Sequence, residues 1–286
     1  MFNFPLLKPL IASTFLFTVQ THAFNVYQSI PWKNYADIKG NIFYNQTQAQ
    51  FNQFLTNQNI KPITVVYMSS LLTNYKVDPE KLKKVANLSK TSPTTPICLD
   101  IEFNPKDNHG SVVPVILDAL RMYKQFGGAA PIGVYGELPH THSNSYPTVV
   151  TKLYFTSLNN QSAEIANHVD FLFPSLYYKT LNDVNIWDAR SKFTLDEAKR
   201  FAKKRNLKII PFISASRWLS YDNKKVKYQP LSASEMKHTL FFLKNQGMDG
   251  AVLWDEPNAI DNHNQPAIFD TTKEPYKTII NFANSK

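Results

Sequence analysis

The sequence contains a single cysteine, Cys98, among its 286 residues. One cysteine cannot form a disulfide within the chain, so the stability of the fold must come from its apolar core. The sequence also lacks a glycine-rich phosphate-binding loop after its first predicted strand. That absence argues against a doubly wound, nucleotide-binding sheet.

Long hydrophobic runs are missing as well, because no segment reaches the roughly 18 apolar residues that a membrane-spanning helix needs. A shorter, largely apolar run, 10–19, follows the lone charge of Lys8, and Thr21-His22-Ala23 resembles a small-x-small cleavage site. This is the pattern of an export signal. The sequence therefore predicts a signal peptide over 1–23 and a secreted or periplasmic mature chain without a membrane span. A retained N-terminal anchor is the alternative.

Acidic residues are outnumbered, with 22 Asp and Glu against 31 Lys and Arg, which gives a formal charge of +9. The basic residues gather at 81–84, 199–205 and 224–227. Such clusters either attract an anionic polymer or envelope surface, or they are solvated helix faces and a loop, which is the commoner role. No zinc-finger spacing or RNA-binding signature is present, so we expect no nucleic-acid partner.

Short apolar runs rich in β-branched and aromatic residues recur along the chain, and each is short enough for a strand. They lie at 24–27, 63–68, 97–101, 132–135, 169–178, 207–213 and 250–254. Segments with helical periodicity separate them, which predicts parallel strands joined by right-handed crossovers. We therefore predict an α/β fold over residues 24–286, a single distorted TIM-like (β/α) barrel of about seven parallel strands.

Helix signals support this alternation. Thr194 with Glu197, and Ser232 with Glu235, have the spacing of capping boxes, and each pair predicts a helix that begins at that point. A further helix is predicted over 113–122, where apolar residues recur at near-helical spacing.

The third apolar run ends in two acids, Asp100 and Glu102. Alternate residues of a strand share a face, so the two side chains point the same way from positions about 6–7 Å apart. In a barrel this strand end belongs to the catalytic face. Two carboxylates in a partly dry site retain a proton between them, and the group that holds it can serve as a general acid. The alternative is a pair of solvated acids at a strand end.

Aromatic residues lie at or near the carboxyl ends of the other predicted strands. An aromatic face with one polar edge suits a sugar ring, which offers C–H faces and hydroxyl edges. The predicted substrate-binding residues are Tyr27, Tyr67, Tyr135, Tyr177, Trp254 and, as a hydroxyl-binding acid, Asp255. Any one of these tyrosines could instead belong to the packing, whereas five aromatic residues at one end favour carbohydrate binding.

Other chemistries find less support. His140-Thr141-His142 has the form of a metal-binding pair but lies in a polar loop, where we expect solvated side chains. There is no G-x-S-x-G elbow for a serine hydrolase, and Cys98 precedes the acids within an apolar strand, as a core residue does. The sequence predicts neither a metal nor a cofactor.

Taken in order, the strand ends resemble those of the animal and venom hyaluronidase family. The opening segment 24–27, with Ile30-Pro31, is similar to the family's first strand, and 99–105 resembles its Asp-x-Glu segment. The other similar segments are Ile132-Gly133-Val134-Tyr135, Phe173-Pro174-Ser175-Leu176-Tyr177, Ile209-Ile210-Pro211-Phe212 and 247–254.

This resemblance implies a seven-stranded distorted barrel and a retaining, substrate-assisted glycosidase. It implies that Glu102 protonates the leaving oxygen while the N-acetyl carbonyl of the substrate attacks the anomeric carbon. Asp100 and Tyr177 would then hold the acetamido group, with Trp254 as a wall of its pocket and Tyr135 near the site. The sequence thus indicates a hyaluronidase-like glycosidase, with Asp100, Glu102 and Tyr177 as catalytic residues.

The chain departs from the family pattern after the acids, where Phe103 and Asn104 replace a bulky aromatic and an arginine. The predicted substrate is therefore an N-acetylhexosamine-containing polysaccharide, whether anionic or not, and the protein is expected to be a monomer. The alternatives are a glycan-binding barrel without catalysis and a barrel glycosidase acting on another cell-wall or envelope polysaccharide.

Overall fold

The computed structural model describes residues 23–285 apart from 33, 104–110, 141–144, 223–224 and 262. The predicted signal peptide, except for Ala23, lies outside the described residues. Within them, no helix has the length and apolar character needed to cross a membrane.

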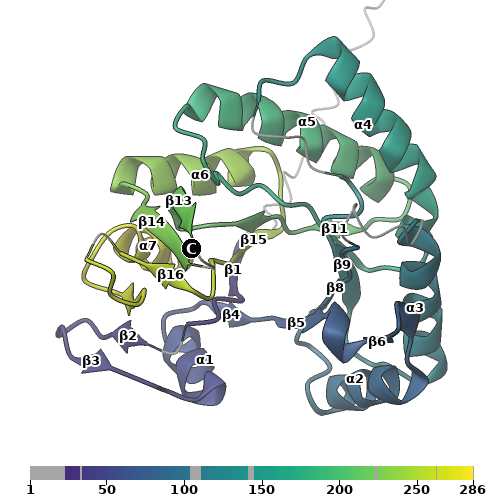
Figure 1. Ribbon diagram of the computed structural model, residues 1–286, viewed down its shortest axis with the longest axis horizontal. Helices are drawn as coiled ribbons and strands as arrows, with labels where there is room; N and C mark the ends of the chain where they lie inside the picture. The colour runs from purple at the N-terminus through teal and green to yellow at the C-terminus, as the bar shows by residue number, and fades with distance from the viewer. Residues whose placement is uncertain are drawn as a thin grey trace, which may run out of the picture.

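Two parallel sheets form the wall of a distorted barrel, which Figure 1 shows with its helices arranged around it. One sheet has the order β12-β15-β1-β4 and the other β11-β10-β9-β8-β5. These strands are β1 (Asn25–Gln28), β4 (Lys61–Pro62), β5 (Thr64–Tyr67), β8 (Ile97–Asp100), β9 (Ile132–Tyr135), β10 (Phe171–Phe173), β11 (Lys208–Ile209), β12 (Phe212–Ile213) and β15 (Gly250–Leu253).

Two of the predicted strands are interrupted, and both interruptions lie where the sheets meet. The run 61–67 pairs with β1 through β4 and with β8 through β5. The run 208–213 pairs with β10 through β11 and with β15 through β12. Each run therefore belongs to both sheets and links them, which gives seven strand positions around the barrel. The predicted fold class is confirmed.

The interior of the barrel is apolar and aromatic. Cys98, Phe173, Phe212 and Val252 are buried there together with Tyr27 and Tyr177. Gly133 leaves room for this packing, because a Cβ at that position would lie 2.5 Å from the Phe173 ring. The outward-facing residues of the same strands pack under the helices in a second, larger core.

Helices surround the barrel wall (Figure 1). They are α1 (Gln48–Thr56), α2 (Pro79–Thr91), α3 (Val113–Gln125), α4 (Val149–Gln161), α5 (Val184–Ala202), α6 (Ala233–Asn245) and α7 (Tyr276–Asn284), with short 3₁₀ turns at Met68–Ser70 and Ala163–Asn167. The capping box of Ser232 and Glu235 is present at the start of α6, as predicted.

The helix start predicted at Thr194 is wrong. Helix α5 begins at Asp183, whose side chain accepts a hydrogen bond from the amide of Asn185. Thr194 lies in the middle of this helix, where its hydroxyl donates to the Arg190 carbonyl at 3.1 Å. The true start was hidden because Asp183 has no Glu or Gln three residues later to complete a capping box.

Three small sheets lie outside the barrel wall and were not predicted. A hairpin, β13 (Ser216–Asp222) and β14 (Lys225–Pro230), pairs with β16 (Ala259–Ile260). A second sheet contains β2 (Tyr35–Ala36), β3 (Ile42–Phe43) and β17 (Phe269–Asp270), and a third β6 (Leu72–Thr73) and β7 (Lys76–Val77). The hairpin follows β12, so it stands beside the carboxyl ends of the barrel strands.

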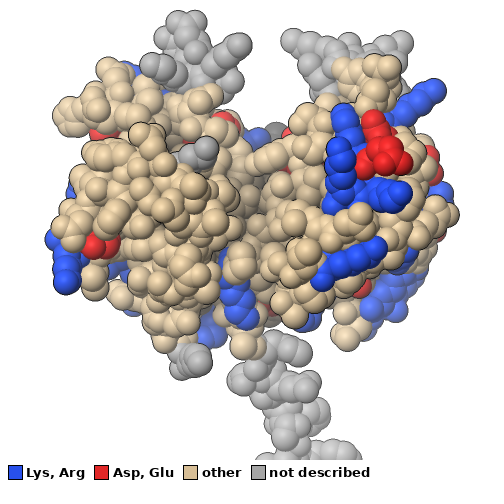
Figure 2. All heavy atoms as spheres, turned by 90° about the horizontal axis from the view of Figure 1, so that it is seen from below, with Lys and Arg blue, Asp and Glu red and all other residues tan. Residues whose placement is uncertain are grey.

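A furrow runs down the side of the barrel between α1 and α2, and Figure 2 shows it through the middle of that face. It encloses about 310 Å³ and is lined by uncharged residues, among them Asn52, Gln53, Thr56 and Ser92. The Lys and Arg side chains on this face are scattered around the furrow (Figure 2).

Candidate active site

The two acids predicted to form the site do share a pocket. Asp100 is the last residue of β8, and Glu102 follows two positions later. Both line a pocket of about 90 Å³ together with Val65, Tyr135, Tyr177, Phe212 and Trp254. A cavity measured in this way needs roughly 10–15 Å³ to hold one water, so the pocket has room for several waters or for a substituent of a sugar ring.

The alternation of β8 explains why both acids point inward. Cys98 is fully buried inside the barrel, and residues two and four positions later continue on the same face. Leu99 and Ile101, between them, are buried against the helices on the outer side. The strand therefore supplies apolar packing at its start and two acids at its open end.

Asp100 and Glu102 interact electrostatically. Burial and, to a smaller extent, the nearby charge of Glu102 together raise the pKa of Asp100 to about 7. Burial also raises the pKa of Glu102, whereas the charge of Lys179 lowers it. Because two like charges in a poorly solvated site resist joint ionisation, the pair retains one proton to near neutral pH.

Tyr177 lies beside these acids and is held from several sides. Its ring is 5.1 Å from the ring of Trp254 and 6.4 Å from that of Tyr135. The Tyr135 hydroxyl donates to the Ser175 hydroxyl at 3.1 Å, and the phenols of Tyr135 and Tyr177 are hydrogen-bonded to each other. Burial, as the largest cause, raises the pKa of Tyr177, so its phenol stays protonated. Because the Tyr135 proton goes to Ser175, Tyr177 is the donor in the bond between the two phenols.

Helix α5 holds the backbone of the same segment. The buried guanidinium of Arg190 donates to the carbonyl of Tyr177. Trp187 donates from its indole nitrogen to the carbonyl of Leu176 at 2.8 Å and stacks on Tyr178 at 4.9 Å. Two side chains of one helix therefore fix the loop that carries Tyr177. No sequence pattern predicts this contact, because it depends on how α5 packs.

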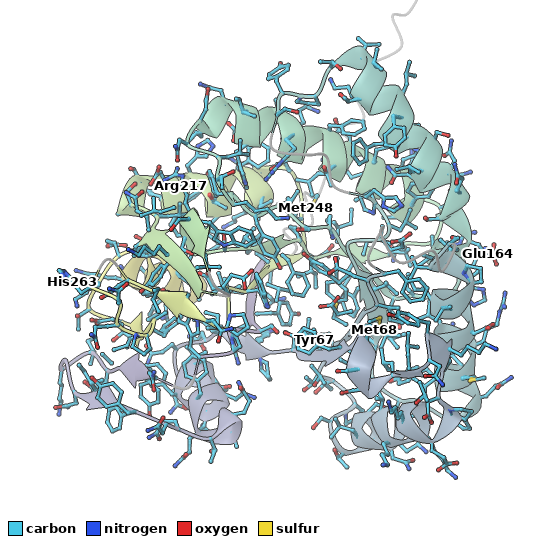
Figure 3. All side chains as sticks on the ribbon, in the orientation of Figure 1. Tyr67, Met68, Glu164, Arg217, Met248 and His263 are labelled. Atoms are coloured by element: carbon cyan, nitrogen blue, oxygen red, sulfur yellow. The ribbon has the colours of Figure 1, made fainter. Side chains whose placement is uncertain are left out.

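The remaining wall of the pocket is Trp254, just after β15. Its indole nitrogen donates to the phenol of Tyr67, which ends β5. The Tyr67 side chain is 44% exposed and lies near the middle of the barrel in Figure 3. Tyr67 is therefore at the rim of the site rather than in the pocket.

Tyr27 is not brought to the pocket, contrary to its prediction as a substrate-binding residue. Its ring packs against Gly250 at the start of β15, where a Cβ, if one were present, would lie 3.3 Å from the ring. It lines a different cavity with Asn25, Lys208 and Asp249, all near the amino ends of strands. The alternation correctly placed Tyr27 inside the barrel, but it did not specify to which end the ring points.

Asp255 is not in the pocket either. Trp254 faces the barrel interior, so the next residue faces the opposite side of the chain. Asp255 is 1% exposed and accepts a hydrogen bond from Ser216 at 2.7 Å. It belongs to the packing between the barrel and the β13–β14 hairpin, so the structure does not bring it to the pocket, as its predicted hydroxyl-binding role would require.

Two charged residues near the pocket were missed. Lys179 is exposed, and its charge reaches both Glu102 and Glu256. Its ammonium lies 5.7 Å from the Trp218 ring, and its carbonyl accepts from the Trp218 amide at 2.8 Å, which ties it to the hairpin. Glu137 follows β9 and interacts electrically with Glu102. Both lie in connections after strands, where the sequence pattern carries no periodic signal.

The predicted solvated loop at 140–142 is partly corrected. The His140 ring nitrogen lies 3.4 Å from Ser162 and 3.4 Å from Glu137, and burial lowers its pKa. Residues 141 and 142 lie outside the described part of the chain.

Comparisons with known proteins agree with the fold. No family model matches the chain, and no curated protein matches it. A crystal structure of bee venom hyaluronidase is similar over 81% of this chain and 91% of that chain, with a TM-score of 0.51 and 16% identity. A chitinase from Chromobacterium violaceum is similar over 92% of each chain, with a TM-score of 0.45 and 11% identity. The chain shares the barrel fold of a glycoside hydrolase. The first likeness carries this conclusion, and at that identity it extends to the fold alone.

Proposed function

We propose that the protein is a retaining, substrate-assisted glycoside hydrolase that cleaves N-acetylhexosamine-containing polysaccharide, as in the hyaluronidase family. The observation that carries the proposal is the coupled pair Asp100 and Glu102 in one pocket with Tyr177 and Trp254. The pocket is sized for a substituent such as an acetamido group, and its walls offer a phenol donor, a carboxyl group and an aromatic face.

In the first step Glu102 donates its proton to the glycosidic oxygen as the bond to the anomeric carbon breaks. The acetamido carbonyl oxygen of the same sugar forms the new bond to that carbon and gives a cyclic oxazolinium intermediate. Tyr177 donates to the acetamido group, and the Asp100 carboxylate accepts its N–H and stabilises the positive charge that develops.

In the second step Glu102, now ionised, takes a proton from water as the water oxygen attacks the anomeric carbon. The ring of the intermediate opens, the acetamido group is restored, and Glu102 is again protonated. Two displacements at one carbon retain its configuration. The contacts of α5 with the backbone of this segment support the assignment, because they fix the Tyr177 oxygen and only its proton has to turn from Tyr135 to the acetamido group.

Export to the periplasm or the medium, as expected from the sequence, would bring such an enzyme to extracellular polymers. The net positive charge is compatible with an anionic polymer.

A polysaccharide screen tests the proposal. Release of reducing ends is measured from hyaluronan, chondroitin, chitin oligomers and peptidoglycan, with Glu102→Gln as the control. We expect cleavage of at least one N-acetylhexosamine polymer and inhibition by a thiazoline mimic of the cyclic intermediate. Cleavage without thiazoline inhibition would indicate another barrel glycosidase mechanism. Binding without cleavage of any of these polymers would instead indicate a glycan-binding barrel.

A further inference from the structure

A groove lies at the amino ends of the barrel strands, at the opposite end from the candidate active site. It consists of a cavity of about 220 Å³ and an adjoining cavity of about 540 Å³. Lys208, the first residue of β11, lines both cavities, so we treat them as one amino-end groove. Asn25, Tyr27, Ile210 and Asp249 are among the residues that line the smaller cavity, and Asp170 and Arg205 are among those that line the larger.

Hydrogen bonds to the backbone fix the wall of this groove. The Lys208 amide donates to the Asp170 carbonyl at 3.2 Å. The Asp249 amide donates to the Ile209 carbonyl at 3.0 Å, and the Asp249 carboxylate accepts from the Ile209 amide at 2.9 Å. The Asp170 carboxylate likewise accepts from the Ile132 amide at 2.9 Å. Each carboxylate keeps a second oxygen to which no described residue donates, so the groove presents acceptors that are already oriented.

The charged residues that line the groove balance one another. They are two acids, Asp170 and Asp249, and two bases, Arg205 and Lys208. None of the four forms an ion pair within the part of the chain that the structure describes, and the Lys208 ammonium lies 6.0 Å from the centre of the Phe171 ring. A bare anion would meet the two acids, and a bare cation would meet the two bases. A hydroxyl group suits both, because it donates to a carboxylate and accepts from an ammonium or guanidinium group.

Tyr27 adds a donor to the groove. Its side chain is 8% exposed, and its phenol forms no hydrogen bond with a described residue. Burial, as the largest cause, and the charge of Asp249 raise the pKa of Tyr27, so the phenol stays protonated. A nearly buried polar group without a partner is costly unless water or a ligand in the cavity satisfies it. The phenol therefore indicates an occupant that accepts a hydrogen bond.

We propose that the amino-end groove is a second carbohydrate site, which binds a segment of an uncharged N-acetylhexosamine oligomer without cleaving it. Sugar hydroxyls meet the fixed carboxylates and the two bases, and the Tyr27 phenol donates to a sugar oxygen. The C–H faces of the sugar contact apolar residues of the lining, which include Pro131, Leu207 and Ile210. The larger cavity lies within the roughly 300–1,000 Å³ that is typical of ligand sites.

Binding at this end does not lead to cleavage. Asp170 and Asp249 line different cavities, whereas Asp100 and Glu102 share one pocket. The inference goes beyond the proposed function, because it needs neither the acid pair nor the chemistry of the acetamido group. On a long polymer, a second contact raises the effective concentration of the chain at the catalytic face. Since the groove lies at the other end of the barrel from the reacting bond, it contributes to binding and not to the chemical step.

The test is the binding of chitin hexamer to Glu102→Gln, a variant that the proposed mechanism leaves unable to cleave the probe. NMR follows the backbone amides of Ile209, beside the groove, and of Tyr177, in the catalytic pocket, as the hexamer is added. We expect the Ile209 signal to shift until it saturates, and Lys208→Gln in the same background to weaken that binding about tenfold. The matched control is Lys152→Gln, on α4 outside the groove, which should weaken it by less than about twofold.

No shift at Ile209, with or without one at Tyr177, would overturn the inference, and so would equal weakening in the two lysine variants. Tighter binding of triglycine than of the hexamer would also overturn it, because it would indicate a site for zwitterionic peptides. If Lys208→Gln does not fold, Tyr27→Phe decides instead, since it removes only the phenol oxygen and should weaken binding about threefold. Saturable binding at the groove, with no cleavage of any polymer by the wild type, would refute the proposed function and leave this inference standing.

Discussion

Asp100 and Asp255 both lie at the end of an apolar barrel strand, yet their surroundings differ. Each stands at the carboxyl end of a barrel strand, and burial raises the pKa of each to about 7. Asp100 faces a pocket with a second acid and two phenols, whereas Asp255 faces the packed core beside Ser216. A raised pKa therefore identifies a buried acid, and the side of the strand on which it lies decides whether the acid can meet a substrate.

The largest expected effect is a difference in activity between a variant in the Asp100 pocket and a variant at Asp255. Glu102→Gln, which removes the general acid of the Asp100 pocket, should lower kcat by about 10²- to 10⁴-fold. Asp255→Asn should leave kcat near the wild-type value, because it lies outside the pocket. Both are measured as reducing-end release from the same polymer, with folding checked by circular dichroism. Equal losses in the two variants would remove the distinction.

Two tyrosines inside the barrel extend the comparison. Tyr177→Phe removes a fixed donor from the pocket and should lower kcat by about 10²-fold. Tyr27→Phe alters the opposite end of the barrel and should change kcat by less than about twofold, since such a residue contributes packing rather than transition-state contacts. Steady-state kinetics on one substrate measures both. A large loss of kcat in Tyr27→Phe would show that the cavity near the amino ends takes part in the reaction.

The pH dependence of the wild type sharpens the role of the pair. The active form has one proton on the Asp100 and Glu102 pair, and that proton is lost as the pH rises through about 7. Above that point kcat/KM should fall about tenfold per pH unit, and on the acid side it should fall when the second carboxylate is protonated. A profile that is flat from pH 5 to pH 9 would contradict the shared proton.

The last prediction concerns stability rather than activity and belongs to Asp255. Its folded pKa of about 7 exceeds its ordinary value of 3.8, so its stabilising contribution is complete below pH 4 and is lost as the pH rises to about 7. The loss is at most about 1.4 kcal/mol per pH unit. Asp255→Asn should remove this dependence and be more stable than wild type at pH 8. Urea unfolding at pH 4, 6 and 8 measures it, and parallel curves for the two proteins would contradict the burial argument.

Much of the fold could be predicted from the sequence because it follows from local patterns. The short apolar runs gave the seven strand positions, and the alternation around Cys98 placed both acids on the inner face. The same alternation, applied to Trp254, would have turned Asp255 away from the site. The direction of the Tyr27 ring depends on neighbouring strands and could not be read from its own segment.

The residues that hold the site depend on contacts between distant elements. Arg190 reaches Tyr177 because α5 packs under the loop after β10, and the early start of that helix has no capping box. Glu137 meets Ser162 at the end of α4 and His140 in the loop after β9. No spacing in the sequence encodes these contacts.

The central claim is that Asp100 and Glu102 share one proton in an open pocket. NMR titration of the carboxyl carbons of wild type, Asp100→Asn and Asp255→Asn tests it most directly. The account predicts that the carboxyl groups of Asp100 and Asp255 both titrate near pH 7, and that each variant lacks the titration of the residue it replaces. It also predicts a lower pKa for Glu102 once Asp100 is replaced. Ordinary titration of both Asp100 and Glu102 near pH 4, with no change in Glu102 when Asp100 is replaced, would contradict it.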